Sequence, residues 1–109
     1  MLELTKETFE EEVLLAKGFV FVDFYGDGCA PCAALRPRVD KLAEKYEGSL
    51  KFTALNTSKA RRLAISQSVL GLPVLAVYKD GGKIKELAGE SATVENLETL
   101  LCELSGQVI

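Results

Sequence analysis

The segment from Phe19 to Cys32, FVFVDFYGDGCAPC, constrains the fold more than any other part of the chain. Its first half is β-branched and aromatic and nearly continuous, as in a strand that is buried on both faces of a sheet. Gly26 and Gly28 then permit a sharp reversal, and the apolar spacing from Ala33 onward is that of a helix. The pattern predicts a buried strand, a turn and a helix, with two thiols where the helix begins.

Length and charge limit the classes of protein to consider. The chain has 109 residues, enough to bury a core, so we expect one domain over residues 1–109. Its net charge of −3 gives no positive field that would attract nucleic acid, and we interpret Arg36/Arg38 and Arg61/Arg62 as solvated helix faces. No apolar run approaches the ~20 residues that span a bilayer, and the acidic start MLELTKETFEEEV lacks the features of a signal peptide. We therefore expect a cytoplasmic protein with no nucleic-acid or membrane partner.

The chain contains three cysteines and no histidine. An odd number of cysteines does not fit a secreted disulfide framework, whereas Cys-x-x-Cys in a cytosolic chain indicates redox or metal chemistry. The lack of histidine excludes Cys–His proteolysis and Cys2His2 zinc binding. Two thiols cannot complete a tetrahedral zinc site, and Cys102 is far away in the sequence. We therefore favour redox chemistry and expect no metal.

Periodicity and turn residues divide the chain into strands and helices. We expect helices over 6–17, 30–46, 59–68 and after Thr93, and strands over 2–4, 19–25, 50–55, 72–78 and 83–88. Asp80-Gly81-Gly82 predicts a hairpin turn, and Gly89 predicts a bulge or a close backbone approach. The order β-α-β-α-β-α-β-β-α predicts an α/β fold of parallel βαβ units with a closing antiparallel hairpin.

These motifs together resemble the thioredoxin family from one end of the chain to the other. The matching pieces are VDFYGDGCAPC, the helix proline Pro37, GLPVLAVYKDGG and Gly89. The resemblance implies a central mixed sheet with helices on both faces, and a protein that reduces disulfides in target proteins. It also implies re-reduction by a flavoprotein thioredoxin reductase, and we expect a monomer with no cofactor of its own.

The resemblance assigns roles to the Cys-x-x-Cys pair. Cys29 is the candidate nucleophile, because at a helix N-cap the unpaired backbone N–H groups and the helix dipole favour a thiolate. Cys32, one turn inside the helix, is placed to resolve a mixed disulfide. Ala30 and Pro31 lie between them, where the family usually has Gly-Pro. In the family this dipeptide tunes the redox potential.

Asp23 interrupts an otherwise apolar strand. We expect it to be buried behind Cys32, with a raised pKa and a role in proton transfer toward that thiol; the alternative is a structural Asp satisfied by the backbone. Typical thioredoxins place a Lys near this Asp, and the matching position here is Ala54. Without that ammonium group, we expect Asp23 to be still harder to ionise.

Other residues match the surface on which the family docks its targets. Pro73 resembles the family's cis-proline, with Leu72 before it facing the cysteines, and Gly71 and Gly89 provide an uncluttered surface. The chain departs from the family at two positions, since Gly28 and Tyr25 stand where tryptophans are usual. This variant motif resembles thioredoxins of anaerobic, amino-acid-fermenting bacteria that supply electrons to selenoprotein or glycine reductases.

Two other functions are compatible with these residues. One is a glutaredoxin-like reductase that uses glutathione, and the other is a non-catalytic subunit that holds a partner on the thioredoxin surface. Cys102 falls between Glu95 and Glu98 on the last helix, away from the leucine stripe. We interpret it as an inert, partly covered thiol, with intermolecular disulfide formation or regulation as the alternative.

Overall fold

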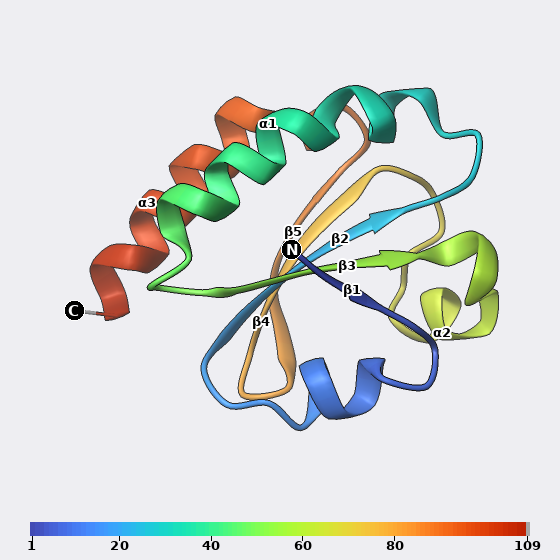
Figure 1. Cartoon of the computed structure of the whole chain (residues 1–109), viewed down its shortest axis with the longest axis horizontal. Helices are drawn as coiled ribbons and strands as arrows, with labels where there is room; N and C mark the ends of the chain where they lie inside the picture. Colours follow the sequence, from blue (N-terminus) through green and yellow to red (C-terminus); the bar gives the residue numbers. More distant parts are fainter. Residues whose placement is uncertain (109) are drawn as a thin grey trace.

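The computed structural model describes residues 1–108 and has strand β2 (Phe19–Tyr25) at the centre of a five-stranded sheet. The strand order is β1-β3-β2-β4-β5 (Figure 1). Strand β2 is buried along its length except at Tyr25, as its continuous apolar sequence predicts. The other strands are β1 (Leu2–Leu4), β3 (Lys51–Asn56), β4 (Val74–Lys79) and β5 (Gly82–Ala88).

Helices cover both faces of this sheet (Figure 1). Helices α1 (Ala30–Tyr46) and α3 (Val94–Val108) lie side by side over one face, and η1 (Glu10–Leu14) and α2 (Arg61–Ser66) lie over the other. Alternate residues of β2 point into the two cores, Phe19 and Phe21 toward α1 and α3, and Val20, Val22 and Phe24 toward η1 and α2. The expected α/β fold with a mixed sheet is confirmed.

Two of the expected helices are shorter than predicted. The helix expected over 6–17 is a turn after Thr5 followed by the π-helical η1 of 5 residues. Only Phe9 and Val13 are fully buried in this stretch, so its apolar face is too small to stabilise a longer helix. The helix expected over 59–68 is the 3-10 turn η2 (Thr57–Lys59) followed by the 6 residues of α2.

Strand β4 runs antiparallel to its neighbour β2, whereas the βαβ pattern predicted a parallel strand. The length of α2 explains the difference. A helix of this size advances the chain by about 9 Å, against roughly 20 Å for a strand such as β3. The chain therefore enters β4 at the same edge of the sheet at which it left β3.

The β4–β5 hairpin forms where it is predicted, at Asp80 and Gly81, which have φ angles of 50° and 88°. The irregularity in the ladder lies elsewhere: Val77 and Tyr78 of β4 pair with Lys85 and Lys83 of β5, so the pairing skips Ile84. Gly89 instead begins the 3-10 turn η3 (Gly89–Ser91) with φ of 58°. No atom lies within 4 Å of the place where its Cβ would be, so the predicted bulge or close approach at Gly89 is wrong.

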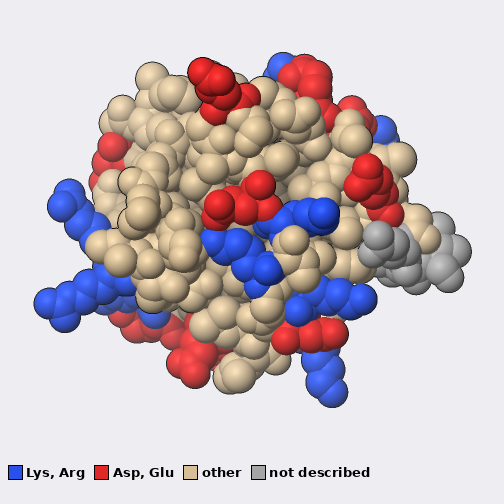
Figure 2. Space-filling model, turned by 180° about the vertical axis from the view of Figure 1, so that it is seen from behind, with Lys and Arg blue, Asp and Glu red and all other residues tan. Residues whose placement is uncertain are grey.

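Charged side chains of both signs share the surface. Arg38 and Glu95 form an ion pair of 2.9 Å between α1 and α3, and Lys45 and Glu98 form another of 2.6 Å. On the face seen in Figure 2, basic side chains lie beside acidic ones and do not gather into a single patch. Among the helices within residues 1–108, none has the length and apolar character needed to cross a membrane.

Candidate active site

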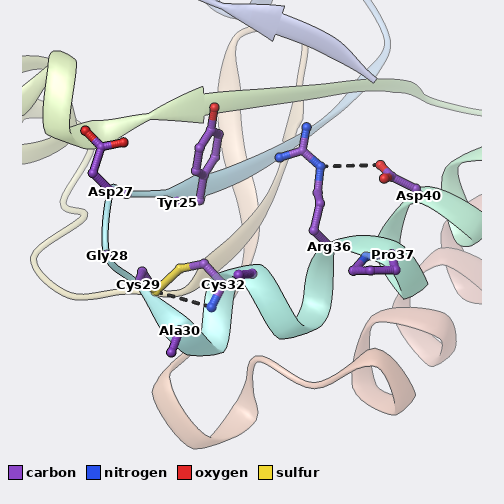
Figure 3. Close-up of a pocket in the computed structure, with 11 residues that line it drawn as sticks. Tyr25, Asp27, Gly28, Cys29, Ala30, Cys32, Arg36, Pro37 and Asp40 are labelled. Carbon is purple, nitrogen blue, oxygen red and sulfur yellow. Dashed lines mark hydrogen bonds and ion pairs between the residues drawn. A yellow bond between two sulfur atoms is a disulfide. The ribbon is translucent and has the colours of Figure 1, made fainter.

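The two cysteines lie at the first turn of α1, where the sequence predicted them. Cys29 is the N-cap residue, and its Sγ accepts a hydrogen bond of 3.2 Å from the backbone N–H of Cys32 (Figure 3). Cys29 and Cys32 form a disulfide with their Cα atoms 5.3 Å apart. Helix α1 has 17 residues, so its N–H groups and dipole present positive potential to the Cys29 sulfur. Pro31 lies in the first turn, where its missing N–H costs least.

The two cysteine residues are unequally exposed. Cys29 is half-buried, whereas the whole of Cys32 is only 5% exposed. Ala30 and Pro31, between them, are both exposed. A disulfide in another protein therefore has access to the pair from the side of Cys29.

The loop that carries Cys29 is fixed by hydrogen bonds from the next βα connection. The backbone N–H of Asp27 donates to Ser58 Oγ at 2.9 Å, and the Asn56 amide donates to the Asp27 carboxylate at 3.0 Å. Thr57 Oγ1 donates to the carbonyl of Tyr25 at 2.9 Å. Ser58 was not among the site residues that the sequence predicted. A polar run directly after β3, at the same sheet edge as the cysteines, was the available signal.

The expected docking residues lie around this loop. The Leu72–Pro73 peptide bond is cis, as the resemblance implied. The side chain of Leu72 reaches the cysteine loop, because a Cβ on Gly26 would lie 2.8 Å from Leu72 Cδ1. Ala88 pairs with Val74 in the β4–β5 ladder, so Gly89 continues alongside Pro73. Gly71 is exposed at the same place.

Asp23 is buried, as the sequence predicted, with 3% of its surface exposed. It occupies the α1 face of β2 between Phe21 and Tyr25. Among residues 1–108, no hydrogen bond joins its carboxyl group to another side chain or to the backbone, and no fully buried side-chain oxygen or nitrogen atom lacks a partner. Burial raises the pKa of Asp23 to about 6, with smaller contributions from Asp40 and Glu3, while the Arg36 guanidinium opposes the rise.

The prediction that Arg36 belongs to a solvated helix face is wrong. Its side chain is 31% exposed and reaches back over the sheet, where the guanidinium lies 5.3 Å from the centroid of the Tyr25 ring. Its Nη2 lies 3.7 Å from Glu3 Oε1. Its Nε lies 3.4 Å from Asp40 Oδ1, as Figure 3 shows. Asp23 therefore has a nearby cation, Arg36, although Ala54 stands where a lysine is usual. The signal in the sequence was the spacing, since Arg36 follows Cys32 by one helical turn.

A groove of about 830 Å³ runs from the cysteines along α1. Gly28 and Tyr25, the residues that replace the family's tryptophans, both line it, with Cys29, Arg36 and Pro37 (Figure 3). Gly28 has φ of 75° and no atom within 4 Å of its Cβ position, so no bulky group covers this side of Cys29. The groove is thus open toward the disulfide.

The remaining thiol lies apart from this site. Cys102 is on α3 and is exposed, more so than the partly covered thiol that we expected. In the described part of the chain, no group of three or more His, Cys, Asp or Glu side chains is arranged to hold a metal ion. The chemistry that the site offers is that of the Cys29–Cys32 pair.

A redox-active cysteine pair at a helix N-terminus, on a mixed sheet with helices on both faces, defines the class of thiol–disulfide oxidoreductases. The thioredoxin family model matches residues 1–103. The chain is 49% identical to a thioredoxin of Peptoclostridium acidaminophilum over 97% of this chain and 96% of that one. It is 52% identical to a thioredoxin of Acetoanaerobium sticklandii over 93% and 96% of the two chains, and 34% identical to Thioredoxin 1 of a Nostoc species over 80% and 81%. The chain belongs to the thioredoxin family and is a thiol–disulfide oxidoreductase whose partners are proteins that contain disulfides.

Proposed function

We propose that Cys29 is the nucleophile and Cys32 the resolving thiol of this oxidoreductase. The Cys29 thiolate attacks a target disulfide, forms a mixed disulfide and releases one target thiolate. The Cys32 thiolate then attacks Cys29 Sγ, which forms the Cys29–Cys32 disulfide and releases the second target thiol. Two electrons and two protons pass from the dithiol to the target. The N-cap position of Cys29, with its sulfur accepting the Cys32 N–H at 3.2 Å, is the observation that carries this assignment.

Asp23 is the group that takes the proton from the Cys32 thiol in the second step. Its burial on the α1 face of β2, together with a pKa raised to about 6, supports the role, because a base works best when its pKa is near the working pH. Proton transfer proceeds through water, as the carboxyl group is not in hydrogen-bond contact with the sulfur in the described structure.

Target proteins dock across the exposed surface around Cys29. Residues from three segments contribute to it, namely Gly28, Ala30 and Pro31 beside Cys29, the exposed Gly71 and half-buried Leu72 before the buried Pro73, and Gly89 after β5, with Tyr25 at the rim of the groove. An extended target segment that contains a disulfide would lie against these residues and present its sulfur to Cys29.

A flavoprotein thioredoxin reductase is the proposed source of electrons, and the chain acts as a single-domain monomer in the cytoplasm. The family membership supports the reductase, and the net charge of −3, with acidic and basic side chains interspersed on the face seen in Figure 2, supports a monomer that remains dissolved at cellular concentration. The test is NADPH oxidation in a mixture of the reductase, the chain and a protein disulfide. A glutathione-coupled assay is the control, since activity there instead would indicate a glutaredoxin-like function.

The test of the cysteine roles is reduction of insulin disulfides under dithiothreitol. Wild-type protein is expected to accelerate the reaction, and Cys29→Ser to abolish the acceleration. Cys32→Ser is expected to accumulate a mixed disulfide between Cys29 and insulin, which mass spectrometry detects. A Cys29→Ser variant as active as wild type would overturn the assignment. A Cys29→Ser/Cys32→Ser variant that keeps full biological function would indicate a binding subunit instead.

A further inference from the structure

Four residues from different strands form one row beneath α1. Glu3 of β1 pairs with Ala54 of β3, Ala54 pairs with Asp23 of β2, and Asp23 pairs with Leu75 of β4. Residues in register across neighbouring strands point to the same face of a sheet, about 4.8 Å apart from strand to strand. Glu3 and Asp23 therefore lie two strands apart on the α1 face, with only the methyl group of Ala54 between them.

Arg36 lies beside this row. Ala54 is fully buried and carries only a methyl group. The Arg36 guanidinium contacts Glu3 at one end of the row and lies over Tyr25, the next residue after Asp23 on the same face of β2.

The guanidinium is held on several sides. Asp40, one turn further along α1, accepts from its Nε at 3.4 Å, and Glu3 lies 3.7 Å from Nη2. The Tyr25 ring lies beneath it, and the Tyr25 hydroxyl donates to Glu3 Oε2 at 2.6 Å, which fixes the Glu3 carboxylate as well. An arginine restrained in this way keeps its charge at one place relative to Asp23.

We propose that Arg36 is the positioning residue of this active site, and that its guanidinium, clamped by Glu3, Tyr25 and Asp40, keeps the buried Asp23 available as a carboxylate. This proposal rests on the proton-transfer role proposed for Asp23. Arg36 does not touch the reacting sulfur atoms. It acts through Asp23, by balancing the loss of water around that carboxyl group with a fixed positive charge.

The charged side chains that face Asp23 come from two of the elements packed around it, helix α1 and strand β1. Helix α1 contributes Arg36 and Asp40, and β1 contributes Glu3, while the neighbours of Asp23 in register on β3 and β4 are the uncharged Ala54 and Leu75. Arg36 is the only cation among these groups in the described structure. Its removal would leave Asp23 facing two carboxylates.

The first test measures the Asp23 carboxyl titration by carbon-detected NMR, independently of activity. In Arg36→Gln, the titration midpoint of Asp23 is expected to rise by roughly one pH unit. Arg38→Gln is the matched control, because Arg38 is on the same helix and pairs with Glu95 of α3 at 2.9 Å. That variant is expected to leave the midpoint unchanged. An Arg36→Gln midpoint equal to that of Arg38→Gln would overturn the proposal.

Two variants test whether the charge, and not the shape of Arg36, is responsible. Arg36→Lys keeps the charge without the planar group and is expected to restore part of the shift. Arg36→Gln/Ala54→Lys places an ammonium in the same row and is expected to bring the midpoint back toward the wild-type value. If neither lysine variant moves the midpoint from that of Arg36→Gln, the electrostatic account is wrong.

The second test follows the resolving step by stopped flow. Dithiol protein is mixed with the uncharged 2,2′-dithiodipyridine, so that the first thiopyridone reports attack by Cys29 and the second reports resolution by Cys32. Arg36→Gln is expected to slow the second phase by roughly fivefold at pH 6 and barely at pH 8, as a midpoint shift of about one unit requires. An equal slowing at both pH values would indicate a structural role and overturn the proposal.

Asp23→Asn separates this proposal from the one on which it rests. If Asp23→Asn resolves as fast as wild type at every pH, Asp23 is not the base, and both proposals fail. If Asp23→Asn is slow while the Asp23 midpoint in Arg36→Gln stays near 6, the role of Asp23 holds and the role of Arg36 alone is overturned.

Discussion

Gly26 and Leu72 contact each other where the cysteine loop meets the loop before β4. A Cβ on Gly26 would lie 2.8 Å from Leu72 Cδ1 and 3.2 Å from Ser58 Oγ. Gly26 does not have a positive φ, so a larger residue here would be opposed by the close approach of the Leu72 side chain, which would have to move, and not by the backbone conformation. The contact sets the distance between the loop that carries Cys29 and the segment that carries Pro73.

Gly26→Ala is therefore expected to push Leu72 away from the cysteines and to impair docking of proteins. We expect kcat/KM for a protein disulfide to fall roughly tenfold, because small displacements of groups at a reacting site lower the rate strongly. The effect on a small-molecule disulfide should be smaller. Steady-state assays with insulin and with 2,2′-dithiodipyridine compare the two. Gly48→Ala is the control, since no atom lies within 4 Å of that Cβ position. Equal losses on both substrates would contradict the docking explanation.

The buried carboxyl group of Asp23 also makes stability depend on pH. Burial raises its pKa from 3.8 to about 6 in the folded protein, so the folded state binds the proton more tightly than the unfolded state. The contribution of Asp23 to stability is thus fully present below pH ~4 and is lost as the pH rises through about 6, by up to about 3 kcal/mol.

Asp23→Asn removes this penalty and should be more stable than wild type at pH 7, with the advantage disappearing near pH 4. Urea unfolding at both pH values measures the difference in the free energy of unfolding. Glu103→Gln is the control, because Glu103 is exposed on α3 and takes no part in the charge network around Asp23. An Asp23→Asn variant that is less stable than wild type at pH 7 would show that the carboxylate makes favourable contacts that outweigh its burial.

The sequence predicted those parts of the site that depend on neighbours along the chain. The bounds of β2 and α1, the N-cap position of Cys29 and the burial of Asp23 all follow from the pattern around the cysteines. The role of Arg36 was misinterpreted because one of its partners, Glu3, is on strand β1, far from Arg36 in the sequence. Only the order of the strands in the sheet brings Glu3 and Arg36 together. The direction of β4 was missed because it depends on the true length of α2, which periodicity overestimated.

The β4–β5 turn contains a second glycine with a specific requirement. Gly81 has φ of 88°, and a Cβ added here would clash with the backbone carbonyl oxygen of Leu14. Gly81→Ala is expected to lower the free energy of unfolding by about 2–3 kcal/mol, through left-handed strain and a clash with backbone that cannot move freely. Gly82→Ala next to it should change stability by less than about 1 kcal/mol, since its nearest atom is 3.8 Å away. Urea unfolding of the pair tests this, and equal losses would contradict it.

Gly28 explains why restoring a tryptophan before the first cysteine would not restore the usual packing. With φ of 75° the position favours glycine, and any other side chain pays for the left-handed backbone. Gly28→Ala and Gly28→Trp are both expected to lose about 1 kcal/mol in the free energy of unfolding. The tryptophan would additionally occupy the groove of about 830 Å³ beside Cys29.

Insulin reduction should therefore fall further in Gly28→Trp than in Gly28→Ala, because only the indole narrows the approach to the Cys29 sulfur. The comparison holds the backbone strain constant and varies the size of the side chain alone. A Gly28→Trp variant that is more stable and more active than wild type would mean that the loop relaxes to a negative φ. In that case the groove would be open only because residue 28 lacks a side chain, and not because of the left-handed backbone at Gly28.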